Sequence, residues 1–134
     1  MPYLICKQCE RELIRPCRWG GPEDHDVAAE VGVAAVTAGV MVVLEDEDSV
    51  VVTGPGGPVG TKIYSPAGAI AANPDDLLPD ALVSAGCDNG CCGSDGTDGP
   101  NRACLCGALV ATQWSDCWTQ AEIRFLPQAV IVRD

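Results

Sequence analysis

Cysteine constrains the folding of this chain more than any other residue type. Nine of the 134 residues are cysteines, and they gather toward the two ends of the chain. Those near the start are Cys6, Cys9 and Cys17, and those toward the end are Cys87, Cys91, Cys92, Cys104, Cys106 and Cys117. Thiols at such close spacing either bind a soft metal ion or pair as disulfides. We interpret the pattern as metal ligation.

The remaining composition predicts a small, mainly β fold. Aromatic residues make up 4% of the chain, and its apolar residues are largely valine and alanine, which suit the pleated surface of a sheet. A chain of this length can bury a core but has little surplus stability, so a metal ion would matter. We expect one domain, residues 1–134, made of a zinc-knuckle-like segment (1–26), a Val-rich β core (27–85) and a cysteine-rich metal-binding segment (86–134).

Short apolar runs separated by turn residues predict short strands and hairpins with little helix. Among the expected strands are residues 69–71, 81–83, 108–113, 122–126 and 129–132. Residues 40–44 and 50–53 flank an acidic turn, which predicts a hairpin between them. Residues 54–60 are rich in glycine and proline and are expected to form a loop. Asn73 followed by Pro74 predicts the start of a helical turn.

The net charge of −11 is unevenly distributed. Residues 1–20 contain four basic and two acidic residues, a net charge of +2, so the rest of the chain carries −13. A surface of this sign repels the phosphates of nucleic acid, and we predict no nucleic-acid partner. It attracts a basic protein, and we expect a protein partner of that kind.

The sequence also predicts a cytoplasmic location and no membrane association. The first residues show no secretory signal pattern, and the longest nearly apolar run, residues 31–44, is too short to span a bilayer. Thiols stay reduced in the cytoplasm, which favours metal ligation over disulfides. Export would reverse that preference.

The strongest metal signal lies in the C-terminal cysteines. Structural zinc takes four ligands in a tetrahedron. Cys104 and Cys106 flank a tight turn, and Gly107 is free to adopt the positive φ that such a turn needs. Cys117 and either Cys92 or Cys91 complete a four-cysteine site, with Cys92 preferred because Gly93 follows it. Iron is the alternative to Zn²⁺ in such a site.

A second candidate site lies near the N-terminus and consists of Cys6, Cys9, Cys17 and His25. Residues 1–16 predict a hairpin, with returning strand 11–14, that resembles the knuckles of zinc ribbons and rubredoxins. In such knuckles two cysteines flank a tight turn whose N–H groups point at the sulfurs, although Glu10 stands where glycine is usual. For His25, which lies among acidic residues, the alternative is an exposed side chain that binds no metal.

A rival arrangement combines the two ends of the chain. Cys6 and Cys9 together with Cys104 and Cys106 would make one zinc ribbon, the middle of the chain being a long insertion. We rank it second because it leaves Cys92 and Cys117 unexplained. The sequence therefore predicts one or two zinc ions.

The C-terminal segment also resembles the cysteine-rich tails of small bacterial proteins. The shared elements are Gly90-Cys91-Cys92-Gly93, Gly99-Pro100-Asn101, Cys104-Leu105-Cys106-Gly107 and Asp116-Cys117-Trp118. The resemblance covers about a quarter of the chain and implies a fold but no activity.

These patterns favour a structural zinc protein over an enzyme. The chain has no nucleophile elbow, phosphate-binding loop or metalloprotease motif. The first hypothesis is recognition of a protein through the acidic surface, as an adaptor, inhibitor or immunity-type protein. The alternative is a thiol-based redox or metal-responsive protein, because the cysteines outnumber the ligands of one site. A third is a hydrolase whose nucleophile is an aspartate or Cys17, the pKa of Cys17 being lowered by the neighbouring Arg15 and Arg18.

Overall fold

The fold is mainly β, as the sequence predicts. The computed structural model describes residues 1–26, 33–45, 48–54, 57–85, 100–114 and 121–134, and of 48–54 and 57–64 only the backbone. The strands of these residues are β1 (Tyr3–Cys6), β2 (Arg18–Trp19), β3 (Val40–Leu44), β4 (Asp48–Gly54), β5 (Gly57–Ser65), β6 (Ala69–Ala72), β7 (Leu82–Ser84), β8 (Arg102–Cys104), β9 (Leu109–Trp114), β10 (Glu122–Phe125) and β11 (Val130–Arg133). Two short 3₁₀ segments, η1 (Pro22–Asp24) and η2 (Pro74–Asp76), accompany them. No helix in the described ranges is long and apolar enough to cross a membrane.

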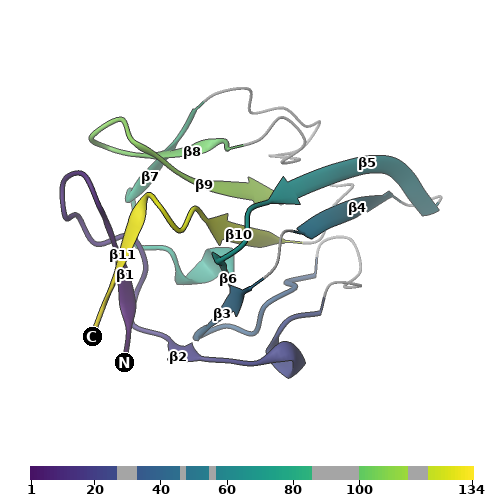
Figure 1. Cartoon of the computed structure of the whole chain (residues 1–134), viewed down its shortest axis with the longest axis horizontal. Helices are drawn as coiled ribbons and strands as arrows, with labels where there is room; N and C mark the ends of the chain where they lie inside the picture. The colour runs from purple at the N-terminus through teal and green to yellow at the C-terminus, as the bar shows by residue number, and fades with distance from the viewer. Residues whose placement is uncertain (27–32, 46–47, 55–56, 86–99, 115–120) are drawn as a thin grey trace.

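A seven-stranded sheet in the order β2-β3-β6-β10-β9-β8-β7 forms the centre of the molecule (Figure 1). Every residue of β6 and β10 is buried, because these strands lie in the middle of the sheet and are covered on both faces. The larger apolar cluster includes Met41, Ile70, Ile123 and Phe125, and a smaller one includes Val36, Val40, Val42 and Ala71. The sheet thus draws strands from all three segments expected from the sequence.

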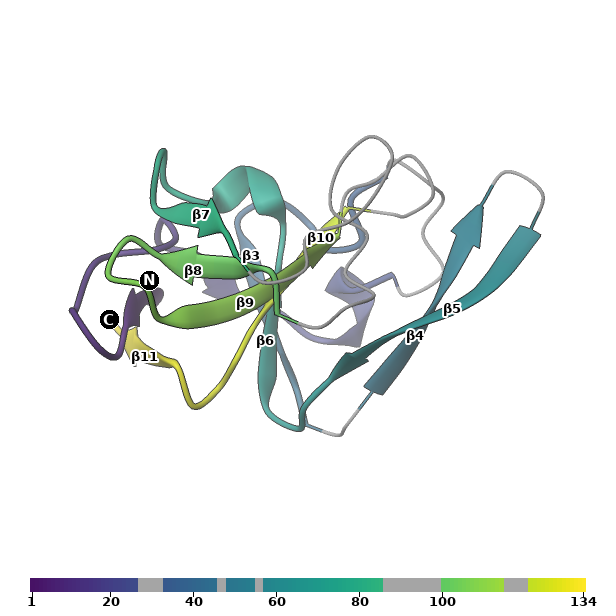
Figure 2. The ribbon, with the colours of Figure 1, turned by 90° about the horizontal axis from the view of Figure 1, so that it is seen from above.

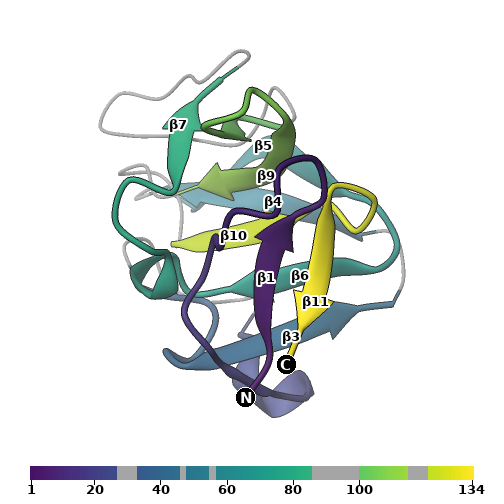
Figure 3. The same ribbon diagram turned by 90° about the vertical axis from the view of Figure 1, so that its left-hand side faces the viewer.

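The first and last strands of the chain form a separate two-stranded ladder. β1 and β11 pair antiparallel, with Leu4 opposite Val132 and Cys6 opposite Val130. The ladder lies crosswise over the main sheet, with both termini at one end of it (Figure 3). Leu4 and Val130 belong to the larger apolar cluster, so the ladder closes the core on this face.

The strand pairing corrects two expectations from the sequence. β3 pairs with β2 and β6 rather than with β4, and β4 pairs with β5. Residues 57–60, expected in a loop, belong to β5, whose hairpin with β4 reaches away from the β1–β11 ladder (Figure 2). The acidic turn does not decide the pairing, because the largely buried β3 lies between β2 and β6, which are both farther from it along the chain than β4 is.

The expected returning strand 11–14 makes only single bridges, Ile5 to Glu12 and Ile14 to Leu77. The expected strands 69–71, 81–83, 108–113, 122–126 and 129–132 correspond to β6, β7, β9, β10 and β11. The helical turn is also confirmed, because the Asn73 side chain accepts a hydrogen bond of 2.9 Å from the Asp75 N–H at the start of η2.

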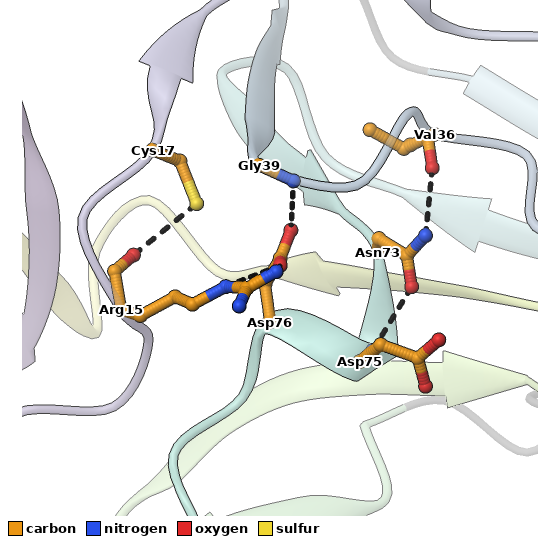
Figure 4. A network of polar contacts seen from close by, with 7 residues as sticks. All are labelled: Arg15, Cys17, Val36, Gly39, Asn73, Asp75 and Asp76. Atoms are coloured by element: carbon orange, nitrogen blue, oxygen red, sulfur yellow. Dashed lines mark hydrogen bonds and ion pairs between the residues drawn. The ribbon is translucent and has the colours of Figure 1, made fainter.

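A buried carboxylate ties three loops together beside the core (Figure 4). Asp76, fully buried, accepts a hydrogen bond of 2.7 Å from the Gly39 N–H and pairs with the Arg15 guanidinium. Nearby, the Asn73 side chain donates to the Val36 carbonyl at 3.0 Å. These bonds satisfy polar groups that would be costly to bury alone, and they hold the N-terminal segment against the sheet.

The opposite face of the sheet contains a buried ionic group. Glu122 accepts from Arg124, which also donates to Ser65 Oγ at 2.9 Å and lies 5.0 Å from the Trp114 ring centroid. His25 Nε2 lies 3.1 Å from the Glu122 carboxylate. Paired charges of this kind are tolerated in a core only while each partner is present.

We predict that Glu122→Gln destabilises the protein by about 3–5 kcal/mol, because the substitution removes the buried negative charge that Arg124 and His25 both contact. Urea denaturation measures the change. The matched control is Glu10→Gln, which removes the exposed partner of Arg133, 3.4 Å away, and is expected to change stability very little. Equal effects of the two substitutions would contradict the role given to the buried pair.

Candidate metal centre

Two cysteine knuckles from opposite ends of the chain have a similar backbone pattern, the first turn being one residue longer than the second. In the first, which follows β1, the Glu10 N–H donates to the Cys6 carbonyl at 2.8 Å and the Cys6 N–H to the Arg11 carbonyl at 2.9 Å. In the second, which follows β8, the Gly107 N–H donates to the Cys104 carbonyl at 2.8 Å and the Cys104 N–H to the Ala108 carbonyl at 2.9 Å. Each knuckle is therefore a tight turn that begins at its first cysteine.

Each turn ends on a residue with positive φ, 63° at Glu10 and 97° at Gly107. This conformation is easy for glycine and costs another L-residue on the order of 1 kcal/mol. Gly107 was expected to take this role. The absence of glycine at position 10 does not prevent the first knuckle, because Glu10 adopts the left-handed conformation instead.

The fold places the knuckles against each other. The Lys7 N–H donates to the Ala129 carbonyl at 3.0 Å, which fixes the first knuckle to the loop before β11. Cys104 lies opposite Leu82 on β7 at the edge of the main sheet. Cys6 and Cys104 both belong to the larger apolar cluster, so hydrophobic packing brings the two turns together.

The four sulfurs of Cys6, Cys9, Cys104 and Cys106 all lie within 4.8 Å of one another. Cys6 Sγ is 3.6 Å from Cys106 Sγ, and Cys9 Sγ is 3.5 Å from Cys104 Sγ. These distances are far longer than a disulfide bond, and the thiols are free. A tetrahedron with Zn–S bonds of about 2.3 Å has edges of about 3.8 Å, which matches this spacing.

The sulfurs differ in their surroundings. Cys6 and Cys104 are buried, whereas Cys9 and Cys106 are exposed. Burial raises the pKa of the Cys104 thiol to about 12. A hydrogen bond from the Ala108 N–H lowers the pKa of the Cys106 thiol to about 7. The centre thus combines a sulfur that readily becomes a thiolate with one that keeps its proton until a cation replaces it.

Cys17, expected among the N-terminal ligands, does not belong to this group of sulfurs. Its buried thiol donates to the Arg15 carbonyl at 3.2 Å (Figure 4). Burial, and next the charge of Asp76, outweigh the lowering effect of Arg15 and raise the pKa of Cys17 to about 11, so the predicted net lowering of this pKa is wrong. A thiol of this kind is a poor nucleophile.

His25 also lies apart from the cysteines. Its side chain is only 5% exposed and contacts Glu122, so the alternative of an exposed histidine is wrong. Cys87, Cys91, Cys92 and Cys117 lie outside the described residues. What the structure does bring together is the ligand set of the rival arrangement, one pair of cysteines from each end of the chain.

No family model, no curated protein and no solved structure matches the chain. The candidate centre therefore stands on its own geometry.

All four cysteines were candidates from the sequence, but the preferred grouping was different. Cys92 and Cys117, which the rival arrangement leaves without a role, favour two separate sites. A local signal pointed the other way, because each knuckle supplies only two ligands and each follows a strand with a buried cysteine at its end. Two such half-sites can complete a tetrahedron only by meeting.

We predict that Gly107→Ala weakens zinc binding roughly tenfold. No neighbouring atom lies within 4 Å of the added Cβ, so the cost arises from forcing alanine to a φ of 97°. A penalty of about 1–2 kcal/mol corresponds to that loss of affinity. Competition with a chromogenic chelator measures it. Gly39→Ala, also at positive φ in open space but outside the centre, is the control and should leave zinc affinity unchanged.

Proposed function

We propose that this protein binds Zn²⁺ through Cys6, Cys9, Cys104 and Cys106, and that the ion has a structural role in a protein that acts by recognising another protein. The observation that carries the first part is the cluster of four free sulfurs from two matching knuckles. The second part is supported by the charge of the chain.

The donor set favours zinc. Four thiolates in a tetrahedron are a soft ligand field that suits Zn²⁺, and iron is the competing ion for the same geometry. Calcium and magnesium require oxygen ligands and are disfavoured here. The lowered pKa of Cys106 supports metal uptake near neutral pH, because a ligating thiol must lose its proton.

The geometry favours a structural ion over a catalytic one. With four sulfur ligands the coordination of zinc is complete, and no position remains for a water molecule or a substrate. In the sequence, Cys104 lies 95 residues after Cys9, and Cys106 lies 100 residues after Cys6. An ion held between them would connect the N-terminal segment to the edge of the main sheet.

Recognition of a basic partner follows from the electrostatics. The chain has a net charge of −11, and an ion held by four thiolates would make it −13, since Zn²⁺ offsets two of four new negative charges. An excess of this size raises the encounter rate with a basic protein and disfavours nucleic acid. Such recognition is compatible with the role of an adaptor, an inhibitor or an immunity-type protein.

Elemental analysis of protein purified under reducing conditions tests the zinc centre. We expect Cys9→Ser and Cys106→Ser each to lower the zinc content by one ion per chain relative to the unmodified protein. Loss of zinc should also lower the midpoint of thermal unfolding by on the order of 10 °C, the shift expected when free zinc is about a hundredfold above its Kd. Cys17→Ser removes a thiol outside the cluster and should keep the full zinc content.

Equal zinc content in all three variants would contradict the proposed centre. Iron in place of zinc would confirm the ligands and change the ion. The absence of any metal in the unmodified protein, with all thiols free and no uptake of added zinc, would reject the proposal.

The recognition role is tested by capture on the immobilised zinc-bound protein. We expect a basic partner whose binding weakens as NaCl rises from about 0.05 M to about 0.5 M, because salt screens exposed charges. Neutralising residues 45–48 with E45Q, D46N, E47Q and D48N should weaken binding roughly fivefold. The control, E10Q with E12Q, neutralises acids in the basic N-terminal segment and should not weaken it. Captured partners insensitive to both salt and the acidic substitutions would contradict the role of charge.

A further inference from the structure

We propose that the cysteine centre is also a site of reversible oxidation, in which a peroxide forms the disulfides Cys6–Cys106 and Cys9–Cys104 and releases the metal ion. This inference rests on the proposed zinc centre and adds a defined oxidised state to it.

The pairing follows from the sulfur contacts. Two sulfur–sulfur contacts join one knuckle to the other, Cys6 to Cys106 at 3.6 Å and Cys9 to Cys104 at 3.5 Å. Each sulfur thus has a near neighbour in the opposite knuckle. Only a small movement separates these pairs from bonding distance.

Exposure assigns the roles within each pair. Cys9 and Cys106 are exposed and accessible to an oxidant, whereas Cys6 and Cys104 are buried. Each pair therefore contains one sulfur that a peroxide can reach and one protected sulfur beside it. In such a pair, the exposed cysteine reacts with the peroxide and the buried cysteine acts as the resolving cysteine.

The chemistry balances for each pair. The exposed thiolate attacks one oxygen of hydrogen peroxide, the O–O bond breaks, and after protonation a sulfenic acid and one water are formed. The buried thiolate then attacks the sulfenic sulfur, the S–O bond breaks, and the leaving hydroxide takes a proton to give a second water. Two thiolates lose two electrons to the peroxide, and the metal ion loses two ligands with each disulfide.

The connectivity has a structural consequence. Both disulfides would join the N-terminal knuckle to the C-terminal one, so a covalent link would replace the metal link between the same two turns. The β1–β11 ladder and the main sheet would stay connected in the oxidised protein. Bonds within a knuckle, Cys6 to Cys9 or Cys104 to Cys106, would leave the two ends of the chain unlinked.

Tryptic digestion distinguishes these outcomes, because cleavage after Lys7 and Arg11 places Cys6 on peptide 1–7 and Cys9 on peptide 8–11. Cys104 and Cys106 remain on peptide 103–124, and Cys17 is on peptide 12–18. After peroxide treatment of the zinc-bound protein, we expect release of one zinc ion per chain, read with a chromogenic chelator. Mass spectrometry should then show peptides 1–7 and 8–11 both linked to 103–124, and the reductant dithiothreitol with added zinc should restore the starting state.

Single substitutions resolve the pairing. After oxidation of Cys106→Ser we expect peptide 8–11 linked to 103–124 and peptide 1–7 unlinked, and after oxidation of Cys104→Ser the reverse. Cys17→Ser is the control and should give the pattern of the unmodified protein. Fragmentation of the unmodified linked peptides between Leu105 and Cys106 gives the same assignment without relying on the folding of a variant.

A bond between peptides 1–7 and 8–11 would overturn the inference, and so would links from these peptides to Cys117 or to peptide 63–102. Zinc that stays bound during peroxide treatment would also overturn it, while leaving the structural zinc centre intact. A protein that never binds zinc rejects the proposed function itself, which keeps the two failures distinguishable.

Discussion

The rest of the structure depends on the meeting of two cysteine turns that the chain separates by about a hundred residues. Four sulfurs within 4.8 Å can all ionise only if a cation lies among them, because neighbouring thiolates repel one another. Hydrophobic packing of Cys6 and Cys104 brings the turns together. The same packing leaves Cys9 and Cys106 at the surface. The proposed metal binding and the proposed oxidation would therefore be two responses to one arrangement of sulfurs.

The β1–β11 ladder makes this meeting possible. It joins the ends of the chain, lies across the main sheet and carries the first knuckle to β8, the strand next to the edge strand β7. Asp76 holds the segment that leaves this knuckle, through Arg15 and the Gly39 N–H. The β1–β11 ladder, the segment that contains Arg15 and the strand β8 are each held by their own contacts, and they meet at the centre. This arrangement keeps the four sulfurs at ligand spacing.

Much of the fold could be predicted from local patterns, and its pairing could not. The apolar runs at β3, β6, β10 and β11, the Asn73 cap and the positive φ of Gly107 all depend on residues close in sequence. The pairing of β3 with β6, and of β4 with β5, depends on which strands are buried together. The conformation of Glu10 could not be predicted from its residue type either. A left-handed backbone is unfavourable for glutamate, and here the hydrogen bonds of the turn hold it.

By itself, the sequence determined that the protein is mainly β, strongly acidic and supplied with two cysteine turns that each offer two ligands. It did so because turn geometry, apolar periodicity and charge are local properties. Only the tertiary structure decided that Cys6 and Cys9 meet Cys104 and Cys106, while Cys17 turns to a backbone carbonyl and His25 to Glu122. These contacts depend on which residues are buried together and on the order of the strands in the sheet. The spacing of cysteines in the sequence gives no information about either.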